Sequence, residues 1–155
     1  MSVLHRHAYA LLTSYWRIRR PITLGVRGVA CDAEGAVTLV QHSYVPGWHL
    51  PGGGVERNET VYDAMVREFR EECGIIVTPD ALRLIGIFGN FREYKSDHVV
   101  LFVASYYTQG ERSASSHEIV GVNRFSLDAL PSDTSEATRR RLEELRSDSE
   151  SPHLW

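Results

Sequence analysis

The sequence is poor in the features that mark several protein classes. It contains two cysteines, Cys31 and Cys73, and neither lies in a Cys-x-x-Cys pair, so we expect no zinc finger and no disulfide framework. Its seven histidines form no His-Glu-x-x-His motif, which excludes that class of zinc protease. No run of about 18 apolar residues occurs, so no membrane span is expected. The formal net charge of -3 gives the chain no overall attraction to nucleic acid or to an anionic membrane.

The composition that is present suits one globular domain. The chain is 43% hydrophobic and 24% charged, and we find no repeat or linker, so residues 1–155 are expected to form a single domain. Residues 3–18 carry apolar side chains at helical spacing and predict a packed amphipathic helix, with a targeting or membrane-surface helix as the weaker alternative. Residues 147–155 predict a polar tail in which Leu154 and Trp155 can dock. The unpaired cysteines fit a reducing cytoplasm, and we see no convincing signal peptide.

Periodicity and turn signals predict strands and helices in mixed order. Two further helices are expected: one over residues 59–73, with Asn58 as its N-cap and Gly74 as its end, and one that starts at the capping signal Asp133-x-x-Glu136 and ends near Arg146. The first two strands are expected to form a hairpin. Strands are predicted over residues 22–31, 36–42, 75–78, 82–91, 98–107 and 118–125. The pattern alone indicates a mixed α and β protein.

The most informative stretch runs from Gly53 to Ile75. On its predicted helix, Glu68, Glu71 and Glu72 fall within an arc of roughly 100°. Three acids that close together repel one another, and a divalent cation is the commonest reason for a folded chain to keep them. A solvated helix face is the plain alternative. The neighbouring arc is apolar and predicts the buried face of the helix; it consists of Tyr62, Met65, Val66, Phe69 and Cys73.

The spacing Gly53-x5-Glu59-x7-Arg67-Glu68-Phe69-x-Glu71-Glu72-x-Gly74-Ile75 resembles the Nudix box and matches it at every fixed position. The lead-in Trp48-His49-Leu50-Pro51-Gly52-Gly53 is also similar to that of the family. The resemblance implies an α/β fold, a Nudix-like α/β/α sandwich with a mixed sheet between helices. It also implies hydrolysis of the pyrophosphate bond in a nucleoside diphosphate that is linked to another group.

The resemblance assigns metal ligands to the box. Glu71 and Glu72 match the family's ligands of Mg²⁺ or Mn²⁺, and the carbonyl of Gly52 matches a common backbone ligand. Glu68 matches a residue that either binds the metal or acts as the general base. Carboxylate and carbonyl oxygens also suit these hard cations on chemical grounds.

Other expected roles lie beside the metal ligands. By resemblance, Glu59 and Arg67 occupy positions of a structural salt bridge, and the helical spacing also places Arg67 near Asp63 and Glu71. The family often recruits one further acid from outside the box, as a ligand or as the base. Glu118 is our candidate, because it follows a polar loop and begins a predicted strand, with Glu93 and Asp97 as the next choices.

Several assignments stay open at this stage. Trp48 and Tyr44 suit either stacking on a base or core packing, and His49 and His42 flank the glycine-rich loop and are weaker candidates for substrate contact. We expect Cys73 to be a buried apolar residue rather than a nucleophile. The run Arg139 to Arg141 fits a solvated helix face better than a nucleic-acid patch; its three members are arginines beside Glu143 and Glu144.

The substrate is also open. The region downstream of the box reads Gly89-Asn90-Phe91, without the Pro of the ADP-ribose group, and Tyr94 lies a little too far along for the dinucleoside polyphosphate group, so the sequence supports neither subgroup and rules out neither. Nucleoside diphosphate sugars and nucleoside triphosphates both remain, as small-molecule nucleotide partners. The alternatives are a non-catalytic Nudix-fold sensor and an enzyme of RNA 5′ ends, which the net charge disfavours. The sequence leaves the oligomeric state open, a homodimer included.

Overall fold

The computed structural model describes residues 22–92, 95–112, 118–147 and 153–155. The helix expected over residues 3–18 and the candidate Glu93 lie outside the described residues. Among the helices that are described, none has the length and apolar character needed to cross a membrane.

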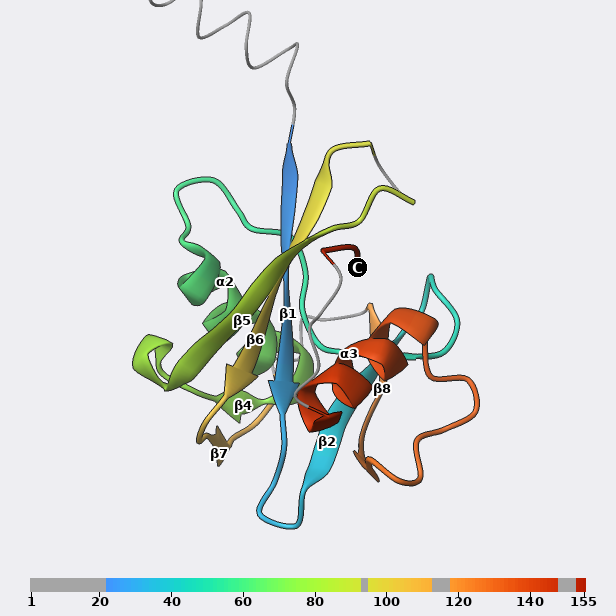
Figure 1. The fold of residues 1–155 in the computed structure, drawn as a ribbon. Helices are drawn as coiled ribbons and strands as arrows, with labels where there is room; N and C mark the ends of the chain where they lie inside the picture. Colours follow the sequence, from blue (N-terminus) through green and yellow to red (C-terminus); the bar gives the residue numbers. More distant parts are fainter. Residues whose placement is uncertain (1–21, 93–94, 113–117, 148–152) are drawn as a thin grey trace, which may run out of the picture.

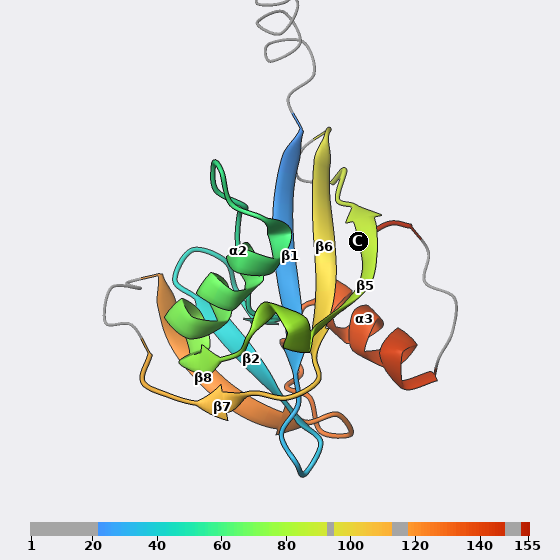
Figure 2. The same cartoon turned by 90° about the vertical axis from the view of Figure 1, so that its left-hand side faces the viewer.

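The central sheet has three strands and is mixed. Strand β1 (Thr23–Ala30) runs parallel to β6 (Asp97–Ala104), and β6 pairs antiparallel with β5 (Leu82–Gly89). β1 and β6 are in register along their whole length, from Thr23↔Asp97 to Ala30↔Ala104. Both strands lie near the middle of the molecule in Figures 1 and 2.

Two smaller sheets complete the strands. In the second sheet β2 (Ala36–His42) lies between β3 (Trp48–His49) and β8 (Ile119–Ser126), and both pairs are antiparallel. A third, two-stranded sheet joins β4 (Ile75–Ile76) to β7 (Thr108–Gln109). Neither β3 nor β7 was predicted, because both lie in segments whose composition indicates a loop.

The expected hairpin between the first two strands is wrong. β1 and β2 are linked by a turn at residues 32–35, but they belong to different sheets and only the bridge Cys31↔Val37 joins them. β1 instead pairs with β6, and its residues Val26, Val29 and Ala30 are buried. A strand that is covered on both faces is typical of parallel pairing inside a sandwich, which a short turn signal cannot reveal.

The box helix differs from its prediction at its start and in the conformation of its last turn. α2 spans Val61–Glu68, and its N-cap is Thr60, whose hydroxyl accepts a hydrogen bond from Asp63 N (3.1 Å). Asn58, the predicted N-cap, has a left-handed backbone with φ of 64°. Residues Phe69–Cys73 continue as the π-helical segment η1, which ends as predicted at the left-handed Gly74. Glu71 and Glu72 therefore lie on π-helical backbone rather than on the predicted α-helix.

Helices cover both sides of the central sheet, which confirms the expected sandwich. α2 and the C-terminal helix α3 (Glu136–Ser147) lie on opposite sides of β1 in Figures 1 and 2. A short 3-10 turn, η2 (Pro79–Ala81), leads into β5. The predicted docking of the C-terminus is also observed, because Trp155 N donates to the Gly89 carbonyl (2.9 Å) and its ring meets Phe88 edge-on.

Two hydrophobic cores fix the position of these helices. On one side the apolar face of α2 and η1, including Met65 and Phe69, packs against Val26 and Phe102. On the other side Leu142 of α3 belongs to the second core, whose further fully packed members are Val29, Val37, Leu39, Leu50, Phe88 and Leu101. Successive residues of β1 and β6 thus point to opposite cores, as strand geometry requires. The rotation of α2 is set by its buried face.

The glycine-rich turn that contains Gly52 and Gly54 passes close to β1. Substitutions in this turn can test how closely it approaches the strand. Gly52 has φ of 141°, and a Cβ atom there would lie 2.0 Å from the Val26 carbonyl oxygen, whereas a Cβ atom at Gly54 would meet nothing within 4 Å. We therefore expect Gly52→Ala to lower the free energy of unfolding by roughly 2 kcal/mol or more, because it adds both backbone strain and a clash. Gly54→Ala should change it by less than about 1 kcal/mol. Chemical denaturation of both variants measures the difference, and equal effects would refute the close approach.

Candidate active site

The glycine turn holds two carboxylates of the box helix. Its backbone is tied to β1, since Val26 N donates to the Gly53 carbonyl (2.8 Å). Glu72 Oε2 accepts a hydrogen bond from Gly52 N (2.7 Å). Glu68 lies against the next glycine, because a Cβ atom at Gly53 would be 2.5 Å from Glu68 Oε1. Both carboxylates are therefore seated under the turn, and a side chain at Gly53 would displace Glu68.

Arg67 connects the box helix to the segment before it. Its guanidinium donates to both carboxylate oxygens of Glu59, at 2.9 Å from Nε and 3.0 Å from Nη2. Nη1 donates to Glu68 Oε1 (2.6 Å) and, more weakly, to Glu71 Oε2 (3.5 Å). Nη2 also donates to the Gly54 carbonyl (3.0 Å). Arg67 thus joins three acids and the glycine turn in one network.

The helical spacing predicts Asp63 as a partner of Arg67, but Asp63 has another partner. Asp63 instead accepts a hydrogen bond from the hydroxyl of Thr60 (2.6 Å), within the N-terminal cap of the helix. The bidentate pair with Glu59 takes its place. Hydrogen bonds from Arg67 lower the pKa of Glu59 and raise the pKa of Arg67 itself. A bidentate pair between a guanidinium and a carboxylate is stronger than a single hydrogen bond between them.

The three box acids differ in burial. Glu68 is 8% exposed and Glu72 is 7% exposed, whereas the side chain of Glu71 is 45% exposed. Burial raises the pKa of Glu68, although the hydrogen bond from Arg67 opposes the shift. Burial also raises the pKa of Glu72, to about 7, and the charges of Glu68 and Glu118 add to that shift. In the absence of a cation these carboxylates are therefore costly to ionise.

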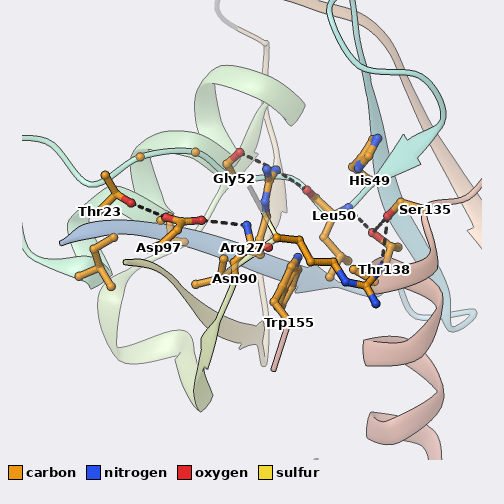
Figure 3. A pocket seen from close by; sticks show the side chains of 18 of the residues that line it. Thr23, Arg27, His49, Leu50, Gly52, Asn90, Asp97, Ser135, Thr138 and Trp155 are labelled. Carbon is orange, nitrogen blue, oxygen red and sulfur yellow. Dashed lines mark hydrogen bonds between the residues drawn. The ribbon is translucent and has the colours of Figure 1, made fainter. Parts of the chain in front are cut away.

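Glu118 lies near this group, and Asp97 does not belong to it. The Glu118 carbonyl accepts from Ser43 N (2.7 Å), which ties the start of β8 to the end of β2. The charge of Glu118 also contributes to raising the pKa values of Glu72 and Tyr44. Asp97 instead accepts from the Thr23 hydroxyl (2.7 Å) and from the side-chain amide of Asn90 (2.8 Å), as Figure 3 shows. It braces strand ends on the other side of the turn.

Carboxylate and carbonyl oxygens are the ligand types that a hard divalent cation binds, but in this structure oxygens of the candidate ligands make hydrogen bonds within the protein. Across residues 22–92, 95–112, 118–147 and 153–155, no three His, Cys, Asp or Glu side chains are already arranged to enclose a metal. Glu68 is bonded to Arg67, and the Gly52 carbonyl accepts from Arg27 Nη1 (2.7 Å). Oε1 of Glu72 faces His42 Nδ1 at 3.9 Å. Buried acids with raised pKa values suit a bound cation, provided that their side chains turn toward it.

A cavity of about 470 Å³ opens on the other side of the glycine turn. Arg27 of β1 stands at its centre in Figure 3, where Nη1 also donates to the Leu50 carbonyl (3.0 Å). Of the three predicted substrate contacts, Tyr44 and His49 line the cavity and Trp48 does not. The ring of Trp48 packs edge-on against Phe125 at 4.7 Å, in the second core. For Trp48 the geometry favours the packing alternative.

Most of the cavity wall could not be found from sequence. The residues concerned come from β1, from the β5–β6 connection, from α3 and from the C-terminus; they are Arg27, Asn90, Arg92, Thr138, Arg140 and Trp155. Only one carries a local signal: Arg27 is a charged residue within an otherwise apolar strand. The others are brought together by pairings and helix packing between segments far apart in the chain.

Comparisons with known proteins point to one family. A family model described as NUDIX domain matches residues 21–145. The chain is 34% identical over 99 residues to the uncharacterized Nudix hydrolase YvcI of Bacillus subtilis (strain 168), an alignment that covers 60% of this chain and 60% of that relative. It is 32% identical over 109 residues to a putative 8-oxo-dGTP diphosphatase of the same organism, with 70% of each chain covered.

A solved structure gives the same answer for the fold. An ADP-ribose pyrophosphatase from Streptococcus suis superposes with a TM-score of 0.64 and 26% sequence identity. The superposition covers 87% of this chain and 97% of that one. The similarity therefore extends well beyond the box, over nearly the whole of the compared structure.

The Arg67 network predicts a loss of stability on truncation. We expect Arg67→Ala to lower the free energy of unfolding by roughly 1–3 kcal/mol, because Glu59 and Glu68 lose their shared partner. Arg70→Ala, which removes an exposed arginine from the next turn, is the matched control and should change stability by less than about 0.5 kcal/mol. Denaturant titration measures both. An Arg67→Ala protein of unchanged stability would show that the network is not structural.

The raised pKa of Glu72 predicts an inverse dependence of stability on pH. In the folded protein the carboxyl of Glu72 has a pKa of about 7, against an ordinary value of 4.5 for a glutamate in the unfolded chain. Between pH 4.5 and pH 7 the folded protein therefore binds more protons than the unfolded chain. In EDTA, stability should therefore fall as the pH rises from about 4.5 to 7, by roughly 3 kcal/mol. Glu72→Gln removes the ionisable group, so its Tm at pH 8 in EDTA should exceed that of the parent.

Glu143→Gln is the control for that measurement, because it removes an exposed carboxylate from α3. It should leave the pH dependence of Tm unchanged. If Glu72→Gln were less stable than the parent at pH 8 in EDTA, the carboxylate of Glu72 would be stabilising rather than strained.

Proposed function

Because the chain belongs to the Nudix family, we propose that it is a divalent-cation-dependent hydrolase that cleaves the pyrophosphate bond of a nucleoside diphosphate linked to another group. The observation that carries the proposal is the seating of Glu68 and Glu72 under the glycine turn, with Glu71 at the edge of the same site. Buried carboxylates of this kind are costly without a counter-charge, and a hard cation supplies one.

Glu68, Glu71 and Glu72 would hold the cation, together with the Gly52 carbonyl once it is released from Arg27. When bound, Mg²⁺ or Mn²⁺ offsets negative charge on the transferring phosphoryl group and lowers the pKa of a coordinated water. The glycine turn keeps both buried carboxylates in place, and Arg67 limits the rotation of Glu68. The protein's own contribution is thus a set of oxygen donors that the glycine turn and Arg67 hold close together.

The reaction also needs a residue that takes the proton of the attacking water. As the water oxygen bonds to phosphorus, the P–O–P bridge breaks and two phosphate-bearing products leave. Glu68 is a poor acceptor in this geometry, because its Oε1 already receives a hydrogen bond of 2.6 Å from Arg67. Glu118 is exposed and its charge reaches Glu72, which supports it as the base or as a further ligand.

The cavity supports a substrate with a nucleoside part. Its volume of about 470 Å³ suits a small ligand, and Tyr44 and Trp155 offer aromatic surface beside polar groups such as Asn90. Arg27 brings positive charge next to the glycine turn, where it donates to the Gly52 carbonyl, and Arg140 of α3 adds positive charge to the cavity wall. The relatives carry the names of a nucleoside triphosphate enzyme and of an ADP-ribose enzyme, so nucleoside triphosphates and nucleoside diphosphate sugars are both candidates.

The experiment is a panel of nucleoside triphosphates and nucleoside diphosphate sugars, each incubated with purified protein and Mg²⁺ or Mn²⁺, with the products identified by mass. We expect turnover of at least one compound, and complete loss of turnover in EDTA. The rival function is a sensor that binds such a nucleotide without cleaving it. Tight binding by calorimetry without any product would favour the sensor.

The metal-binding role of the acids predicts their effect on rate. Glu71→Gln and Glu72→Gln should each lower kcat by roughly 10²-fold or more while the fold is retained, because each removes one negative ligand. Glu143→Gln serves again as the control and should keep the parent rate. Steady-state kinetics with circular dichroism on the same samples tests this. Near-normal rates in both box variants would rule out the proposed catalysis.

The role of Glu118 can be separated from that of Glu68 by kinetics. Glu118→Gln should lower kcat, leave the substrate Kd within a few-fold, and flatten the acidic limb of the pH–rate profile, because it removes the proton acceptor but no substrate contact. Glu68→Gln is measured alongside. If Glu118→Gln follows the parent at every pH while Glu68→Gln is inactive, the base is Glu68.

A further inference from the structure

His42 is a buried side chain without a visible partner. It is the last residue of β2, it is 6% exposed, and the ladder with β8 shifts register between Gln41 and His42. Among the described residues neither Nδ1 nor Nε2 has a hydrogen-bond partner. Buried polar atoms in folded proteins are nearly always hydrogen-bonded, because an unpaired one loses its hydration without compensation. Two orphaned nitrogens on one ring therefore point to a group that binds there.

The ring faces the acids of the candidate active site. His42 Nδ1 lies 3.9 Å from Glu72 Oε1, the oxygen that is not engaged by Gly52. The next residue, Ser43, is bonded through its backbone to Glu118, so the same corner holds both acids. The ring of Tyr44 is 5.1 Å away and closes another side.

The imidazole ring is also a ligand type that metals use. In its neutral form it offers one nitrogen with a free lone pair, and here its neighbour is a carboxylate with a free oxygen.

We propose that His42 is a nitrogen ligand of the divalent cation that Glu72 binds, and that it makes the centre prefer Mn²⁺ or Co²⁺ to Mg²⁺. This inference rests on the metal-dependent function proposed above. Two ligands of one octahedral cation lie about 3 Å apart, so the 3.9 Å pair has to close by less than about 1 Å on loading. Mg²⁺ prefers oxygen ligands, whereas affinity for nitrogen sites rises from Mn²⁺ to Co²⁺.

The competing role for His42 is a hydrogen bond to a substrate phosphate. The two roles differ before any substrate is present. A ligand alters the resting metal centre, whereas a phosphate donor leaves that centre unchanged and alters only substrate binding. A spectroscopic measurement on the Mn²⁺-loaded protein without nucleotide therefore separates them.

The test is electron spin echo envelope modulation of the full-length protein loaded with Mn²⁺. We expect a ¹⁴N modulation typical of coordinated imidazole, and a change to the ¹⁵N pattern when the protein is grown with ¹⁵N-histidine. This isotope comparison needs no substitution, so it holds even where a variant fails to fold. Absence of any nitrogen coupling in Mn²⁺-loaded protein would overturn the proposal.

Two variants then assign the nitrogen. His42→Gln should remove the modulation and weaken Mn²⁺ binding by about tenfold or more, with Mg²⁺ binding changed by less than about threefold. His49→Gln is the matched control: its ring lies 5.8 Å from that of His42 but already contacts the Pro46 carbonyl at 3.0 Å, so the modulation should persist. Modulation that survives in His42→Gln would assign the ligand elsewhere and refute the proposal.

Failure of this inference and failure of the proposed function give different results. Mn²⁺ that binds in a manner abolished by Glu72→Gln, but without nitrogen coupling, overturns the role of His42 and leaves the hydrolase proposal standing. Mn²⁺ binding that Glu71→Gln and Glu72→Gln both leave intact removes the basis of both.

Discussion

The site depends on the close approach of two glycines to two buried carboxylates. Gly52 offers its amide to Glu72 and Gly53 leaves room for Glu68, while the same turn is hydrogen-bonded to β1 on its other side. Because Gly52 has a φ that other residues rarely adopt and lies against the Val26 carbonyl, the backbone there has little freedom. The acids are thus positioned by main chain that the central sheet anchors.

Burial of these acids opposes stability, and the surrounding contacts limit the cost. Glu68 and Glu72 carry raised pKa values because water is excluded from them. Arg67 offsets part of the charge and ties the box helix to Glu59, and the two hydrophobic cores fix the helix and the sheet independently of the acids. A site that is strained without its ligand is a common consequence of selection for function rather than for stability. A bound cation would relieve this strain directly.

Local sequence patterns predicted the positions of most strands and helices well, but they predicted poorly which strands pair with each other. β2 was predicted with its observed bounds, and Gly74 ends the box helix as its sequence position indicated. The hairpin was wrong because the choice between β2 and β6 as the partner of β1 is made by tertiary burial, which no turn signal reports. The observed N-cap is Thr60 rather than the predicted Asn58, because Asn and Thr are both good capping residues and the sequence alone does not distinguish them. The π-helical form of Phe69–Cys73, the segment that carries Glu71 and Glu72, was not predicted either.

Within the site, too, residues that are close in sequence were predicted better than residues that come from distant segments. The box residues are close in sequence, so their spacing could be read directly and predicts their grouping. The cavity is assembled from β1, the β5–β6 connection, α3 and the C-terminus, and only the folded structure brings Arg27, Asn90 and Trp155 together. His42 belongs to neither class. It is near the glycine turn in sequence, but its significance lies in two unsatisfied nitrogens beside Glu72, a property that appears only when burial and contacts are known. The grouping of the proposed metal ligands in the box is therefore encoded locally, whereas the proposed base Glu118, the cavity wall and the surroundings of His42 depend on contacts between distant parts of the chain.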